Sequence, residues 1–130
     1  MSSDTDSKQY QAGMALRVSM WGEAAGEARV KQATSFNRPL EDMVTQWCFG
    51  DVWQRPGLDR KTRSMITLAA LTALCRPNQI KPHVEGALAN GVTVEEIREI
   101  ILHTAVYAGV PTGVEAVNAA KEVLKKLGLD

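Results

Sequence analysis

Apolar side chains recur along this chain at the three- and four-residue spacing that places them on one face of an α-helix. No segment shows the alternation of apolar and polar positions that predicts a β-strand. We therefore expect an all-α fold of six to seven helices. The periodic segments are residues 10–21, 23–32, 39–52 and 60–75, then one ending at residue 89, one at 94–108 and one from about 111 onward.

In the first half, the apolar residues of each long segment fall on one stripe, which we expect to face the core. The stripes are Met14, Val18 and Trp21 in the first segment, and Leu40, Met43, Val44 and Trp47 in the second. Arg55-Pro56-Gly57 follows as a turn, because proline presets φ and glycine tolerates positive φ.

The segment after this turn predicts the central helix of the fold. Asp59 can cap it, and its next sixteen residues are apolar nearly all round, so we expect it to be buried without a solvent face. Arg76-Pro77-Asn78 ends this helix. The next helix ends at Asn90-Gly91, and because proline suits only a first turn, Pro82 predicts that His83 lies near its N-terminal end.

The last two helices carry clear start and stop signals. Thr93 and Glu96 have the spacing of a capping box, with Ile97 and Ile101 expected on the buried face. Gly109 closes this helix, and Pro111 suits the first turn of the next one. The final helix is expected to bury Val114, Val117, Ala120, Leu124 and Leu127.

Length and charge narrow the class of protein. The 130 residues fit a polar tail at 1–9 and a single domain at 10–130. Lys plus Arg and Asp plus Glu balance at 15 each, which argues against nucleic-acid or membrane partners, and no run is long enough to span a bilayer. Cys48 and Cys75 are interpreted as two buried thiols of a cytoplasmic protein. More apolar surface is present than one small core conceals, so self-association is expected.

Two groups of residues could bind and transform a small acid. A neutral His83 imidazole could act as a base, although it could equally well only bond a neighbouring carbonyl. Four cations lie close to Trp53, and one guanidinium among them could clamp a carboxylate. The alternative is a solvated helix start whose cations pair with Asp59 or Glu27. The four cations are Arg55, Arg60, Lys61 and Arg63.

Two further patterns have structural alternatives. The break at Gly109–Thr112 starts a new helix, where Thr112 and Gly113 could donate to an anion, or where two packed helices simply turn a corner. Glu99, His103 and Tyr107 share one stripe, which could be a proton relay or an exposed Glu99–His103 pair with Tyr107 packing inward. The sequence has no metal-ligand spacing or nucleotide-binding glycine loop, so we expect neither metal nor cofactor.

Six phrases in this order resemble the carboxymuconolactone decarboxylase family, which is related to the alkyl hydroperoxidase D-like proteins. The resemblance runs from about Tyr10 to Leu124. It implies an all-α homo-oligomer, commonly a hexamer built as a trimer of dimers. It also implies one of two enzymatic activities. The phrases are Gly50-Asp51-Val52-Trp53-Gln54-Arg55-Pro56-Gly57-Leu58, Arg60-Lys61-Thr62-Arg63-Ser64, His83-Val84-Glu85-Gly86-Ala87-Leu88, Asn90-Gly91-Val92-Thr93, Glu96-Ile97 and Tyr107-Ala108-Gly109-Val110-Pro111.

One branch of the family converts 4-carboxymuconolactone to a β-ketoadipate enol-lactone in the protocatechuate route of aromatic degradation. The other branch is a thiol peroxidase or disulfide reductant that needs a glutamate, two relay cysteines and a histidine. Here Arg76 and Gln79 stand where the relay cysteines belong, and Ser64 stands where the glutamate belongs. Because the thiol relay needs both cysteines, the decarboxylase branch is favoured.

By resemblance, His83 would transfer the proton or donate to the oxyanion, and Arg63 or Arg55 would clamp the substrate carboxylate. Trp53 and Tyr107 would wall the pocket, with Gln79 and Ser64 also contacting substrate. Decarboxylase-like members often have glutamate at the position of Gln79 and tryptophan at that of Phe49, which leaves a changed substrate open. A thiol peroxidase using Cys48 or Cys75 and a non-catalytic oligomer that binds small acids are the two alternatives.

Overall fold

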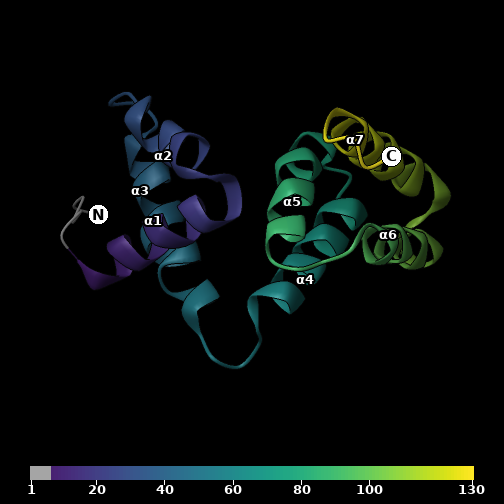
Figure 1. Ribbon diagram of the computed structural model, residues 1–130, viewed down its shortest axis with the longest axis horizontal. Helices are drawn as coiled ribbons and strands as arrows, with labels where there is room; N and C mark the ends of the chain where they lie inside the picture. The colour runs from purple at the N-terminus through teal and green to yellow at the C-terminus, as the bar shows by residue number, and fades with distance from the viewer. Residues whose placement is uncertain (1–6) are drawn as a thin grey trace. The chain divides into compact units, whose positions relative to one another are not determined.

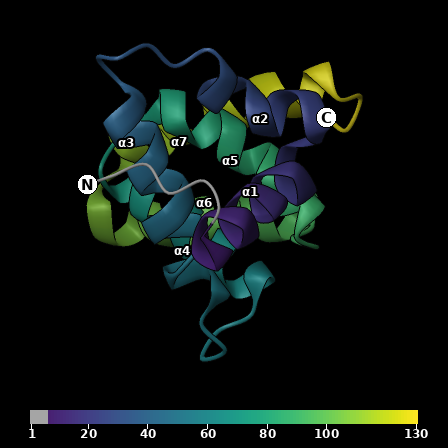
Figure 2. The ribbon, with the colours of Figure 1, turned by 90° about the vertical axis from the view of Figure 1, so that its left-hand side faces the viewer.

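A computed structural model describes residues 7–130 of the chain, and the described residues are helical without any strand. The all-α prediction with seven α-helices is therefore confirmed. Contacts divide the chain into two compact units, Met1–Leu58 and Asp59–Asp130. The chain passes from one to the other through a non-helical turn at residues 55–59, visible in both views (Figures 1 and 2). The single domain expected over 10–130 stays a prediction.

The N-terminal unit contains three α-helices and two short segments of other helical type. They are α1 (Lys8–Trp21), α2 (Glu23–Lys31), α3 (Arg38–Met43), the π-helix η1 (Val44–Phe49) and the 3₁₀-helix η2 (Val52–Gln54). Helix α1 begins inside the tail expected at 1–9, because the Ser7 side chain accepts from the Tyr10 N–H at 3.0 Å. The rest of that tail, residues 1–6, lies outside the described residues.

The two stripes predicted in this unit face its interior only in part, because Trp21 and Val44 pack against the apolar core while other members do not. Leu40 and Trp47 are 55% and 57% exposed, whereas Glu41, Asp42 and Thr45 are buried. The π-helical turn causes part of the error, since its wider hydrogen-bonding pattern breaks the four-residue spacing after Met43. In α1 the buried apolar residues are Leu16 and Met20, and Met14, Val18 and Trp21 are only half-buried.

A buried charged side chain explains this polar interior. Arg17 is 4% exposed, and its guanidinium contacts the Glu41 carboxylate at 3.3 Å and the Thr45 hydroxyl at 3.0 Å. The same guanidinium lies over the Phe49 ring, 5.8 Å from its centre. A glycine at position 13 lets α1 approach η1 closely, because a Cβ there would overlap the Thr45 carbonyl.

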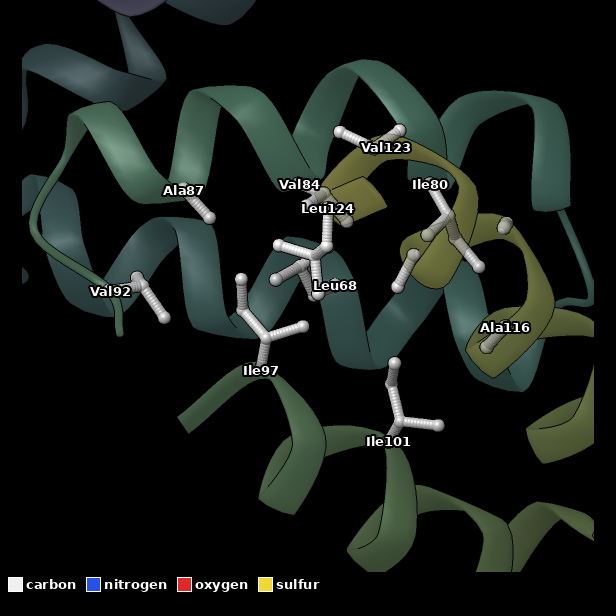
Figure 3. Close-up of a cluster of buried hydrophobic side chains, with 12 residues drawn as sticks. Leu68, Ile80, Val84, Ala87, Val92, Ile97, Ile101, Ala116, Val123 and Leu124 are labelled. Atoms are coloured by element: carbon white, nitrogen blue, oxygen red, sulfur yellow. The ribbon is translucent and has the colours of Figure 1, made fainter. Parts of the chain in front are cut away.

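The C-terminal unit is a group of four helices around an apolar core. They are α4 (Arg60–Ala73), α5 (Pro77–Ala89), α6 (Val94–Ala108) and α7 (Val110–Lys126). Helix α4 packs on all three others, and α7 packs on both α5 and α6. Figure 3 shows side chains from all four helices converging on this core. The core residues are Leu68, Ile80, Val84, Ala87, Val92, Ile97, Ile101, Ala116, Ala119, Ala120, Val123 and Leu124.

Most of the predicted helix ends are confirmed in this unit, and the start of α5 is the exception. Asp59 caps α4 by accepting from the Thr62 N–H at 2.7 Å. Thr93 and Glu96 form the complete capping box, with bonds of 2.9 and 3.1 Å. Gly91 and Gly109 follow α5 and α6 at φ values of 92° and 115°, which a residue with a Cβ rarely adopts. Turn and cap chemistry was thus sufficient to locate these boundaries.

Two predictions about buried faces in this unit are wrong in whole or in part. Helix α4 does have an exposed face, with Ile66 51% exposed, because only Ser64, Leu68 and Thr72 are buried along it. For α7 the prediction is confirmed at Ala120 and Leu124 and wrong at the three other positions, Val114, Val117 and Leu127, which are exposed. The helix turns mainly small residues inward. Close packing is the reason: a Cβ at Gly113 would lie 2.7 Å from the Ala105 Cβ, so α6 and α7 approach through small side chains.

Candidate functional site

Four of the predicted site residues lie on two helices that pack together. Arg63 and Ser64 are on α4, and Gln79 and His83 are on α5. A short turn at residues 74–76 joins these helices, so they run antiparallel. We call the region formed by these four residues and Asn90 the α4–α5 face.

His83 lies in the middle of its helix, which corrects the prediction that it starts one. Pro77 occupies the first turn of α5, so Pro82 is an interior proline. It deprives the Asn78 carbonyl of its usual intrahelical donor, and the helix continues past it. His83 is half-buried, with its Nδ1 atom inside.

A polar stripe along α5 contains His83 and one functional candidate that the sequence analysis missed. Gln79, His83, Gly86 and Asn90 follow one another at four-, three- and four-residue spacing, which puts them on one side of the helix. The Asn90 Nδ2 donates to the Ser64 Oγ at 3.0 Å. Asn90 was interpreted only as part of a helix stop, although its position two turns after His83 was visible in the sequence.

Arg63 is the member of the cation group that turns partly inward. It is half-buried and its Nε atom is buried, whereas Arg55 and Arg60 are exposed. Lys61 pairs with Glu96 at 3.2 Å. Glu27, one of the two acids suggested as partners of these cations, pairs with Lys31 on its own helix at 2.7 Å.

Two of the predicted site residues, Trp53 and Arg55, belong to the N-terminal unit. Trp53 is buried in the core of its own unit, where its ring centre lies 5.6 Å from that of Phe49. Arg55 is exposed in the turn between the units. The structure therefore gives Trp53 a packing role.

Tyr107 lies at the surface of α6, which corrects the expectation that it packs inward. It is 80% exposed, and its ring centre is 5.2 Å from that of His103. Glu99 lies 3.6 Å from Arg98, so its carboxylate has a cationic neighbour on its own helix. These contacts describe a solvent-facing stripe on α6.

Two donor groups in the turn between α6 and α7 bond to the turn's own backbone. The Thr112 hydroxyl donates to the Gly109 carbonyl at 2.8 Å, and the Gly113 N–H donates to the same oxygen at 3.4 Å. Both groups therefore form hydrogen bonds within the first turn of α7.

A surface hollow of about 460 Å³ lies between α5 and α7. It is lined by Lys81, Pro82, Glu85, Glu122, Val123 and Lys126. Lys81 and Glu122 pair across it at 2.6 Å. The predicted site residues are not among its lining residues, so this hollow is separate from the α4–α5 face.

The thiols differ from the expectation that both are buried. Cys75 is exposed, whereas Cys48 is half-buried, and neither forms a disulfide. Burial raises the pKa of the Cys48 thiol, which disfavours the reactive thiolate. In residues 7–130, no group of three or more His, Cys, Asp or Glu side chains could hold a metal ion. No helix in that range is long and apolar enough to cross a bilayer.

The described geometry defines an all-helical protein in which neighbouring helices carry an imidazole and a guanidinium. Residues 38–122 match the model of the carboxymuconolactone decarboxylase family. The 4-carboxymuconolactone decarboxylase of Acinetobacter baylyi is 37% identical over 124 residues, covering 95% of this chain and 92% of that protein. The nitrosuccinic acid decarboxylase npaB of Metarhizium robertsii is 38% identical over 132 residues, covering 98% and 92%. An uncharacterized 15.0 kDa protein of Paracoccus denitrificans is 40% identical over 85 residues, covering 63% and 62%.

The chain belongs to the carboxymuconolactone decarboxylase family, and it is a carboxy-lyase. The resemblance drawn from the sequence phrases, including its decarboxylase branch, is therefore confirmed. The matched range includes all of α4 and α5, so the α4–α5 face lies within the family's shared region.

Proposed function

We propose that this protein decarboxylates 4-carboxymuconolactone or a related carboxylated lactone without a cofactor, yielding a β-ketoadipate enol-lactone in aromatic degradation. The observation that carries the proposal is the position of Arg63 and His83 on two packed helices within the matched region. The near-full-length similarity to a 4-carboxymuconolactone decarboxylase supports the substrate class.

The proposed chemistry uses one cation and one proton carrier. Arg63 binds the carboxylate that the substrate keeps, since a planar guanidinium can hold both oxygens. The bond to the departing carboxyl carbon breaks, and its electron pair delocalises into the unsaturated lactone. His83 then gives a proton to the carbon and regains one from water. A donor aimed at the lactone oxygen contributes about 3–4 kcal/mol in comparable sites. Gln79 would supply it, because its side chain is exposed whereas Ser64 is 2% exposed and accepts a hydrogen bond from Asn90.

The substrate could be any of several acids within this class. One relative's name contains a carboxylated lactone and the other's contains nitrosuccinic acid. Both compounds have an electron-withdrawing group. This group can accept the electron pair that stays on the substrate when its bond to the carboxyl carbon breaks and carbon dioxide leaves. Gln79 is exposed on the stripe that contains His83, where many decarboxylase-like members have glutamate, so it is our candidate for a residue that adjusts substrate choice.

We also propose that the protein acts in the cytoplasm as a homo-oligomer, a hexamer arranged as a trimer of dimers. Large apolar side chains remain exposed on both units, which supports association. In the C-terminal unit, exposed examples on α6 and α7 are Leu102, Val106, Tyr107, Val110, Val114 and Val117.

The decisive experiment measures carbon dioxide release from 4-carboxymuconolactone by purified protein in the presence of a metal chelator. Removing a general acid–base group costs roughly 100- to 10,000-fold in rate, and we expect a loss in that range for His83→Ala. His103→Ala is the matched control, because the chain has only these two histidines, and it should retain full activity. Light scattering on the same sample measures the assembly mass.

Other outcomes separate the alternatives. Equal rates for the two histidine variants would contradict the assigned site. Acid binding without carbon dioxide release would favour a non-catalytic binding protein. Hydroperoxide reduction that disappears when Cys48 and Cys75 are replaced by serine would favour the thiol peroxidase.

A further inference from the structure

The side chain of Asn90 joins the two helices of the α4–α5 face. Its Nδ2 donates to the Ser64 Oγ at 3.0 Å, between residues 26 positions apart in the chain. Ser64 is 2% exposed and Asn90 is half-buried, so this bond is largely shielded from water. A hydrogen bond in such a place holds its partners more firmly than one at the surface.

Ending helix α5 does not require the Asn90 side chain. The backbone N–H of Asn90 bonds to the Gly86 and Ala87 carbonyls, as any residue except proline could do at this position. The left-handed backbone that ends the helix belongs to Gly91, with φ 92°, while Asn90 has φ −87°. The side-chain amide therefore serves its contact with α4.

This contact joins the helices that carry both candidate catalytic groups. Ser64 directly follows Arg63 on α4, and Asn90 lies two helical turns after His83 on the same side of α5. We propose that Asn90 is a positioning residue, which holds α4 and α5 in the register that places the Arg63 guanidinium relative to the His83 imidazole. This inference rests on the proposed decarboxylase function.

A double-mutant cycle on the full-length protein tests the inference. The variants are Ser64→Ala, Asn90→Ala and the combination of both. We expect each single variant to lower kcat about ten-fold, equivalent to about 1.4 kcal/mol in the barrier, with KM changed less than two-fold. The double variant should be no slower than the slower single variant, because both changes remove the same bond. Ser64→Thr, which keeps the hydroxyl, should recover most of the rate.

Asn78→Ala is the matched control, because Asn78 is an exposed asparagine in the first turn of the same helix. It should leave kcat unchanged. The inference is overturned if the Ser64 and Asn90 variants lower the melting temperature without affecting kcat. It is also overturned if their effects on kcat multiply.

A second measurement distinguishes this inference from the proposed function. The chain has two histidines, so NMR can follow the ring signals of His83, with His103 on α6 as an internal reference. We expect Ser64→Ala and Asn90→Ala to shift the His83 ring signals and leave those of His103 in place. The unsubstituted protein could release no carbon dioxide while the substitutions still shift the His83 signals. That result would support the positioning role of Asn90 and contradict the proposed decarboxylase function. Unshifted His83 signals would overturn the inference whether or not the protein is active.

Discussion

The two units of this chain both pack short helices, but they differ in what they bury. In Met1–Leu58 the interior contains Arg17, Glu41 and Thr45, while Leu40 and Trp47 face outward. In Asp59–Asp130 twelve buried apolar residues form one cluster (Figure 3). A polar interior depends on partners that meet at defined distances, whereas an apolar interior depends mainly on volume and shape. The units should therefore respond differently to substitution.

The largest effect on stability is expected when the buried ion pair of the N-terminal unit loses one member. Arg17→Met leaves the buried Glu41 carboxylate with the exposed Arg29 guanidinium, 4.0 Å away, in place of its 3.3 Å partner. Losing one member of a buried ion pair typically costs about 3–5 kcal/mol. Replacing both Arg17 and Glu41 by methionine should cost clearly less, because no isolated charge remains. Urea unfolding, followed by circular dichroism, measures the free energies of unfolding.

Leu40→Ala is the control for this unit, since Leu40 neighbours Glu41 but is mostly exposed. Its effect should stay within about 0.5 kcal/mol in a dissociated chain. A larger loss at high protein concentration that shrinks on dilution would indicate that another copy covers Leu40. If Arg17→Met and the double variant are equally unstable, the polar interior does not depend on the pairing of charges.

In the C-terminal unit the next largest effect should come from a cavity. Leu68 is fully buried at the contact of α4 with the other helices, so Leu68→Ala should cost about 2–5 kcal/mol. Ile66 lies on the same helix, but its side chain is about half exposed, so Ile66→Ala should cost much less. The same unfolding measurement compares them, and equal losses would mean that α4 is covered on both faces in the assembled protein.

The contrast between the units also marks what the sequence could predict. In the C-terminal unit the ends of α4, α5 and α6 followed from Asp59, Gly91 and the Thr93–Glu96 box, because caps and turns are local interactions. In the N-terminal unit the stripe of Leu40 and Trp47 was assigned to the wrong side. No local sequence pattern predicts that Arg17 contacts Glu41, because the two residues are 24 positions apart. The helical periodicity of apolar residues also assigns both charged side chains to the solvent-facing side.

The candidate site also has residues that the sequence could predict and features that it could not. The resemblance to the family predicted one site that includes Arg63, Ser64, Gln79 and His83. In the structure these residues lie on two helices that pack together. The local rule for proline misplaced His83, because Pro77 had already taken the first turn of α5. Asn90 was missed because its side-chain bond to Ser64 depends on how α4 and α5 pack, which the spacing within one helix does not report.

The smallest effect concerns the exposed carboxylates that cap α4 and α6. Hydrogen bonds from Thr62 lower the pKa of Asp59, and the backbone hydrogen bond from Thr93, followed by the contact with Lys61, lowers the pKa of Glu96. A carboxylate whose pKa is lowered on folding stabilises the folded state at neutral pH. This contribution is lost as the pH falls below the ordinary values of 3.8 and 4.5 and through the folded-state values.

Asp59→Asn and Glu96→Gln test this pH dependence, because the amides keep an acceptor oxygen for each cap while removing the charge. Each variant should be slightly less stable than the unsubstituted protein at pH 7, and the difference should shrink as the pH falls below 3.8 for Asp59 and below 4.5 for Glu96. Urea unfolding at several pH values measures the difference. Added salt should reduce the Glu96 difference in particular, since its contact with Lys61 is partly exposed and screened. A difference that persists unchanged in acid would mean that the geometry of the cap, and not its charge, supplies the stability.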